Sequence, residues 1–154
     1  MLSSSTEIIP SRPKSRAQVL RDKVEIRLAV NEAGPAIATI LKMNGVELPG
    51  ADWGKVFPNW LIATVDDDVI GCCQVLIGRP TGFLEFLFVN PKAPFKFRAI
   101  AIRKLLYQGF ATLQHAGSQF VCGGVSVRNK KFAEVLEKMN MLNVGHQALM
   151  VKRI

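Results

Sequence analysis

The sequence predicts one α/β (α+β) domain built on a mixed, mostly antiparallel sheet. Three observations indicate this fold class. Short apolar runs separated by turn residues follow one another in the middle of the chain, which is typical of antiparallel strands. A long segment with apolar residues at helical spacing then separates two such runs, so the strands on either side of it can lie parallel. The chain has 154 residues, 49% of them hydrophobic, which is enough for one packed core.

The composition excludes several classes of protein. No window approaches the ~20 uninterrupted apolar residues that a membrane-spanning helix needs, and residues 1–18 lack the apolar core of a signal peptide. We therefore expect a cytoplasmic protein. Cys72 and Cys73 are adjacent in a predicted strand, where their side chains point to opposite faces and do not readily bridge each other. The chain has no C-x-x-C motif and only two histidines, so no metal site is predicted.

The net charge of +8 is unevenly distributed. Residues 90–154 carry eleven basic and two acidic side chains, whereas residues 31–89 carry three basic and seven acidic ones. The basic half is either an ordinary solvated surface or the binding face for an anion: a nucleotide cofactor, a nucleic acid or an acidic partner. Nucleic-acid binding has only the charge to support it, because no recognition motif accompanies it.

The first half of the chain predicts an arm followed by the beginning of the sheet. Residues 1–21 are assigned to an N-terminal arm or linker, because their first part is rich in Ser, Pro and Arg without periodicity. The folded domain spans residues 22–154. The elements expected there are a strand (Val24–Val30), a helix from Asn31 or Glu32 to about Met43, and two strands (Trp60–Val65 and Val69–Ile77) joined by Asp66–Asp68. These three carboxylates indicate a solvated turn rather than a metal site, since nothing supplies further ligands at a fitting spacing.

The second half of the chain is organised around Thr81–Leu113. An apolar strand, Phe83–Val89, precedes a basic loop, Asn90–Arg98, and a helix over residues 98–115. A strand, a loop and a helix in this order present free backbone N–H groups at the helix N-terminus, where an anion can bind. The remaining elements expected are a strand (Phe120–Val127), a short helix (Asn129–Met139) and an edge strand (Val144–Ile154). The Phe120 strand is expected to run parallel to Phe83–Val89 and to part from it near Val89.

Three segments resemble the GNAT superfamily of N-acetyltransferases, and the likeness covers about residues 22–154. GFLEFLFV is similar to the family's fourth strand, which parts from the fifth strand and pairs with the pantetheine arm of CoA. KFRAIA, starting at Lys96, stands where the family has the R/Q-x-x-G-x-G/A signature around the pyrophosphate. VRNKKFAEVLEKMNML looks like the segment N-x-x-A-x-x-L-Y-E-K-x-G-F. The resemblance implies a GNAT-like fold of six to seven strands, with a central crossover helix and flanking helices, that binds acetyl-CoA or another acyl-CoA.

The resemblance also implies the functional residues. Glu85 stands where family members often carry the carboxylate that removes a proton from the amine; alternatively, it is a strand residue on a solvated face. The cofactor-binding positions that the resemblance implies are Phe88, Val89, Lys96, Phe97, Arg98, Ala99, Ile100, Ala101 and Asn129.

Several positions depart from the family pattern. Ala99 replaces a glycine, Leu136 stands where a tyrosine usually protonates the leaving thiolate, and Asn140-Met141 replaces the closing Gly-Phe. Two hypotheses remain. The first is an N-acetyltransferase that moves an acetyl group from acetyl-CoA to an amine by direct attack. The second is a catalytically degenerate module whose arm and basic face join a homo-oligomer or a larger assembly. An open gap between the Phe83 and Phe120 strands would favour the first.

Overall fold

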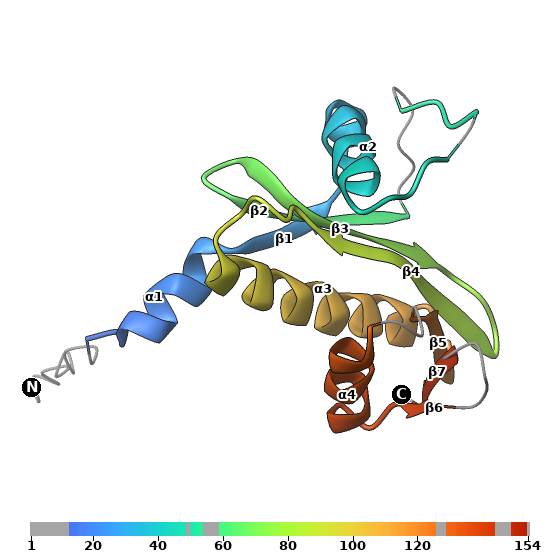
Figure 1. Cartoon of the computed structure of the whole chain (residues 1–154). Coiled ribbons are helices and arrows are strands. Elements are labelled where there is room, and N and C mark those ends of the chain that lie inside the picture. Colours follow the sequence, from blue (N-terminus) through green and yellow to red (C-terminus); the bar gives the residue numbers. More distant parts are fainter. Residues whose placement is uncertain (1–12, 49, 54–58, 126–128, 144–148, 154) are drawn as a thin grey trace, which may run out of the picture.

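The computed structural model describes residues 13–48, 50–53, 59–125, 129–143 and 149–153. Its strands form one seven-stranded sheet in the order β1-β2-β3-β4-β5-β7-β6, with α2 on one face and α3 and α4 on the other (Figure 1). The elements are α1 (Arg16–Lys23), β1 (Glu25–Leu28), the 3-10 turn η1 (Asn31–Ala33), α2 (Gly34–Met43), β2 (Trp60–Val65), β3 (Asp68–Leu76), β4 (Thr81–Val89), α3 (Phe95–His115), β5 (Phe120–Gly124), α4 (Lys130–Lys138), β6 (Leu142–Asn143) and β7 (Leu149–Arg153).

The sheet is mixed and mostly antiparallel, which confirms the predicted fold class. Strands β1 to β4 form an antiparallel meander, and β4 and β5 are the parallel pair joined through α3. Only three residue pairs connect β4 and β5, ending at Phe83 opposite Cys122. The two strands were expected to part near Val89, so the predicted position is wrong and they part near the start of β4 instead.

A β-bulge in β4 accounts for the early parting. Cys72 on β3 lies opposite Phe88 and Gln74 lies opposite Glu85, so two residues of β4 face the single residue between them on β3. Phe86, within the bulge, has a φ of 50°. A bulge of this kind bends the strand and increases its twist, which turns the rest of β4 away from β5.

Two hydrophobic cores lie on the two faces of the sheet. The larger one packs α3 against the strands and includes the fully buried Leu105 and Leu113. The smaller one packs α2 against the opposite face through Ile37, Ile40 and Leu41. Each helix thus buries one apolar face, as the helical spacing of its apolar residues predicted.

Helix α1 was not predicted, because its residues showed no apolar periodicity. Ser15 caps it by accepting a hydrogen bond from the Gln18 backbone N–H at 3.2 Å. At its other end, Lys104 Nζ donates hydrogen bonds to the carbonyl oxygens of Arg21 and Val24, which attach the helix to α3. Residues 1–12 of the predicted arm lie outside the described residues.

Two further features differ from the prediction. Helix α3 begins at Phe95, so that Lys96–Arg98 form its first turn instead of the end of a loop. The cause is Pro94, whose φ is already fixed for a helix start and whose carbonyl accepts from the N–H groups of Phe97 and Arg98. The predicted last strand, 144–154, is preceded by the short β6, with which β7 pairs. Residues 126–128, at the predicted end of the Phe120 strand, lie outside the described residues.

Candidate active site

A cavity of about 540 Å³ opens where β4 and β5 part. It is lined by residues from both strands, from the end of α2, from α3 and from α4. The gap between the two strands is therefore open. The lining residues are Asn44, Val46, Leu84, Glu85, Phe86, Leu87, Phe88, Val89, Ile102, Leu106, Gly123, Gly124, Val125, Asn129, Phe132, Leu136 and Met141.

The β-bulge distributes the β4 side chains over the two faces of the sheet. Leu84 and Leu87 pack into the core around α3, whereas Phe86 and Phe88 pack into the core around α2. Glu85 lies opposite Gln74, whose neighbours Cys73 and Val75 pack into the core around α3, so Gln74 and Glu85 lie on the α2 face. The bulge interrupts the alternation after Glu85, which keeps Phe86 on the same face. The cavity therefore has an α2 side, which contains the carboxylate, and an α3 side, which is aliphatic.

The backbone of β4 is exposed to this cavity beyond the last pair with β5. The β4–β5 ladder ends at Phe83, whereas β4 stays paired with β3 as far as Val89. On its β5 side, β4 therefore has no further pairing with β5 among the described residues, and Leu84–Val89 line the cavity. A ligand with amide groups that lies in the gap can pair with this strand in the way an added strand would.

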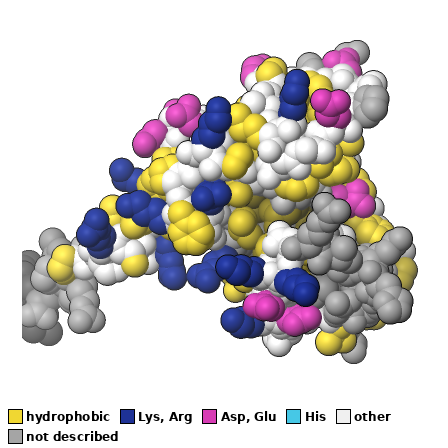
Figure 2. Space-filling view, viewed as in Figure 1, with side chains coloured by type: hydrophobic (Ala, Val, Ile, Leu, Met, Phe, Trp, Pro, Cys, Tyr) yellow, Lys and Arg dark blue, Asp and Glu magenta, His cyan; other side chains and the backbone are white. Residues whose placement is uncertain are grey.

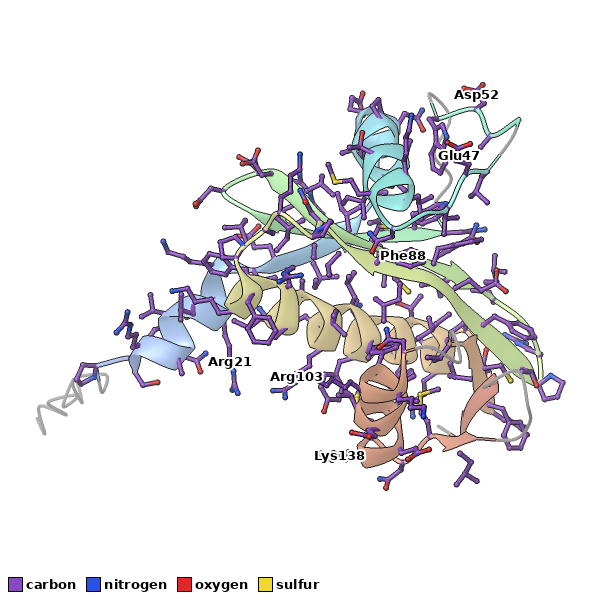
Figure 3. The ribbon with its side chains drawn as sticks, in the orientation of Figure 1. Arg21, Glu47, Asp52, Phe88, Arg103 and Lys138 are labelled. Carbon is purple, nitrogen blue, oxygen red and sulfur yellow. The ribbon has the colours of Figure 1, made fainter. Side chains whose placement is uncertain are left out.

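The residues predicted for the site fall into two groups. Glu85, Phe88, Val89 and Asn129 all line the cavity, and in Figure 3 Phe88 lies at the centre of the sheet between α2 and α3. The segment Lys96–Ala101 instead forms the first turns of α3, where the Ala101 side chain is fully buried in the core. Cofactor binding by both groups stays a prediction.

The start of α3 has features that suit an anion. Its first turn contains no acidic residue, and Lys96 there is exposed. Arg98 places its Cζ 5.7 Å from the centre of the Phe95 ring. Its Nε is buried, and among the described residues it has no hydrogen-bond partner. An unpaired buried donor is costly. A phosphate oxygen at this helix start would satisfy it, so these residues fit the pyrophosphate of CoA.

Asn44, at the end of α2, also lines the cavity but was not predicted as a site residue. Its Nδ2 donates to the carbonyl oxygens of Ile40, at 2.8 Å, and Val89, at 3.1 Å, and so ties α2 to the end of β4. Gly45 follows it with a φ of 77°. An Asn-Gly pair after an apolar helical pattern signals a helix C-terminus, but the sequence does not show that this terminus meets β4.

The cysteines do not form a nucleophilic site. Burial raises the pKa of Cys72 to about 12 and also raises that of Cys73, so both thiols stay protonated near neutral pH.

Within the described ranges, no three His, Cys, Asp or Glu side chains come together in a way that could hold a metal ion. The Asp66–Asp67 turn has positive φ at both residues, as two-residue hairpin turns require. In the same ranges, no helix is long and apolar enough to span a membrane.

No family model and no curated protein matches the sequence. Solved structures do match the fold. N-acetylglutamate synthase from Neisseria gonorrhoeae, complexed with coenzyme A and L-arginine, superposes with a TM-score of 0.69 and 16% identity over 85% of this chain, which spans 33% of that protein. Ard1 from Thermoplasma volcanium superposes with a TM-score of 0.70 and 11% identity, over 86% of this chain and 98% of that protein. The paia N-acetyltransferase from Thermoplasma acidophilum, in complex with coenzyme A, superposes with a TM-score of 0.65 and 14% identity. The match covers 85% of this chain and 99% of that protein. The chain therefore has the GNAT fold.

Proposed function

We propose that the protein transfers an acyl group from acetyl-CoA, or another acyl-CoA, to an amine by direct attack. The observation that carries this proposal is the open cavity between β4 and β5, lined from both faces of the sheet. Two substrates can enter such a cavity from opposite sides and meet at β4.

Acyl-CoA supplies a thioester whose carbonyl carbon accepts the amine and whose sulfur leaves. The chain would hold the phosphates with the N–H groups at the start of α3 and with Lys96 and Arg98. The backbone of Phe88 and Val89 would pair with the pantetheine arm. Two of the three solved structures named above contain coenzyme A, which supports the same ligand here.

Glu85 is the residue that would accept the proton of the amine. It is half-buried, it lines the cavity on the α2 side, and a carboxylate within reach of an amine can act as its general base. The amine nitrogen forms the new C–N bond as the C–S bond breaks, and Glu85 takes one amine proton. The thiolate takes a proton from water, and the proton on Glu85 neutralises the hydroxide that remains. Leu136 lines the opposite part of the cavity and has no proton to donate.

A second candidate function is an interaction module that retains the fold without catalysis. The observation in its favour is Leu136. It lines the cavity with an apolar side chain at the position where the resemblance implies a tyrosine that donates a proton. In this case the N-terminal arm and the basic side chains over α1, α3 and α4 (Figure 2) would contact other subunits. The two functions differ in whether acyl-CoA binds.

Thermal unfolding with acetyl-CoA decides between them. A ligand at a hundred times its dissociation constant stabilises the folded state by about 2.7 kcal/mol. The double charge reversal Lys96→Glu/Arg98→Glu should remove this stabilisation. The matched control Arg16→Glu/Lys23→Glu makes the same change in net charge on α1 and should keep it. If the unmodified protein shows no shift at millimolar acetyl-CoA, the acyltransferase proposal is wrong. If it shows a shift, release of free thiol in the presence of amines measures the transfer.

A further inference from the structure

The α2 side of the cavity has a defined chemical character. It is formed by Asn44, Val46, Glu85, Phe86 and Phe88. Glu85 carries the only ionisable side chain among the described residues that line the cavity. The other side chains on this side are an amide and three apolar groups. An acceptor lying here therefore meets one negative charge surrounded by aromatic and aliphatic surface.

The aromatic wall on this side is held in place from behind. Phe86 stacks on Trp60, with ring centres 6.0 Å apart and an angle of 20° between the planes. Trp60 in turn meets Trp53 edge to face at 6.1 Å. Trp60 is 4% exposed, so the stack is fixed in the core. Such a wall binds an apolar body through contact area, and its ring faces attract a cation.

The polar groups on the α2 side favour a positive charge. Asn44 donates its Nδ2 to the carbonyl oxygens of Ile40 and Val89, and its amide oxygen is an acceptor that carries partial negative charge. The C-terminal end of α2, which carries the negative end of the helix dipole, lies at the same place. Figure 3 shows Glu47 and Asp52 on this side of the sheet, whereas Arg103 and Lys138 extend on the α3 side. A carboxylate on the acceptor would meet repulsion here.

We infer that the acceptor is a primary amine carried on an apolar or aromatic group without a carboxylate next to it. Its ammonium group lies beside Glu85, and its apolar body lies against Phe86, Phe88 and Val46. This inference rests on the proposed function, for which it specifies the class of acceptor. An α-amino acid fits poorly, because its carboxylate lies two bonds from the amine and would face Glu85.

The test compares 2-phenylethylamine with L-phenylalanine, which differ only in the carboxylate. The protein has two tryptophans, both in the stack behind Phe86, so tryptophan fluorescence reports amine binding with or without CoA. The amine should bind at least about tenfold more tightly than the amino acid, because the latter places a like charge beside Glu85. Thiol release from acetyl-CoA should show the same order in kcat/KM.

Two variants test whether the charge of Glu85 causes the preference for 2-phenylethylamine over phenylalanine. Glu85→Gln removes the charge without changing the size of the side chain and should reduce both the affinity for 2-phenylethylamine and its advantage over phenylalanine. Glu137→Gln makes the same change on an exposed residue of α4, on the other face of the sheet and outside the lining, and should alter neither. Circular dichroism checks that both variants fold.

The outcomes separate the acceptor from the reaction. Equal or tighter binding of phenylalanine overturns the inference. It is also overturned if acetyl-CoA stabilises the protein but neither amine changes the fluorescence; the proposed acyltransferase function then stands with another acceptor. If 2-phenylethylamine binds through Glu85 but acetyl-CoA does not bind, the cation site is real and the proposed function is wrong.

Discussion

Replacing Gly124 by leucine should close the cavity while leaving the fold intact. Gly124 lies at the end of β5 and lines the cavity, and a Cβ atom built there meets no other atom within 4 Å. Its φ is not among the positive values, so an L-residue fits the backbone. The leucine side chain would occupy the space that we assign to the pantetheine arm. The variant thus separates ligand binding from stability.

Two changes in melting temperature can be estimated: the one caused by the substitution itself and the one caused by acetyl-CoA. Glycine within a strand is less stable than alanine by roughly 0.5–1 kcal/mol, so filling this position should raise the melting temperature of the free protein by about 1–4 °C. In the wild type, acetyl-CoA at a hundred times its dissociation constant should raise it by about 5–11 °C. In Gly124→Leu, this ligand-dependent shift should disappear.

Differential scanning fluorimetry of the wild type, Gly124→Leu and Gly124→Ala measures these shifts. Alanine is the matched control, because it gives the same backbone effect and adds one carbon atom to the open space. It should keep most of the response to acetyl-CoA. A full response in Gly124→Leu would show that the ligand does not lie between β4 and β5, and would refute the assignment of this cavity.

Three further predictions concern stability and reactivity. Gly82→Ala should destabilise the fold by roughly 1–3 kcal/mol in urea unfolding, because its Cβ would stand 2.5 Å from Leu113 Cδ2 in the core; an unchanged midpoint would contradict this packing. Asn129→Ala should cost about 1 kcal/mol, because its side chain caps α4 through the Phe132 N–H at 3.3 Å, and a serine replacement should restore most of the loss. A thiol reagent at pH 8 should modify Cys72 and Cys73 only slowly in the folded protein, because burial raises the pKa of both thiols; fast reaction of either, located by mass spectrometry, would show that its strand opens.

The elements that the sequence predicted well are those with a strong apolar pattern and clear punctuation. Strand β2 has the predicted bounds, because its apolar run ends at the aspartates, of which Asp66 and Asp67 form the turn. Helix α4 was predicted over Asn129–Met139, and the structure has it over Lys130–Lys138, capped by Asn129. Helix α1 was missed because none of its described residues is buried. Its stability comes from the Ser15 cap and from Lys104, and neither contact leaves a periodic signal.

The candidate site was predicted in part. The resemblance identified Glu85, Phe88, Val89 and Asn129, and all four line the cavity. The contribution of Asn44 depends on a contact across 45 positions of the sequence, between the end of α2 and Val89. No local pattern encodes such a contact. The bulge at Phe86 was missed for a related reason: whether one strand carries an extra residue depends on its register with the neighbouring strand.

The short parallel pairing between β4 and β5 also has a consequence for how the chain folds. Strands β2, β3 and β4 meet over tight turns, so their contacts form at a small loss of chain entropy. Thr81 reaches Phe120 only after the whole of α3 has crossed the sheet. Contacts of such long range form slowly. We therefore expect the meander to form early and the ladder of β5 and β7 to be added late, so that the walls of the cavity come together only at the end of folding.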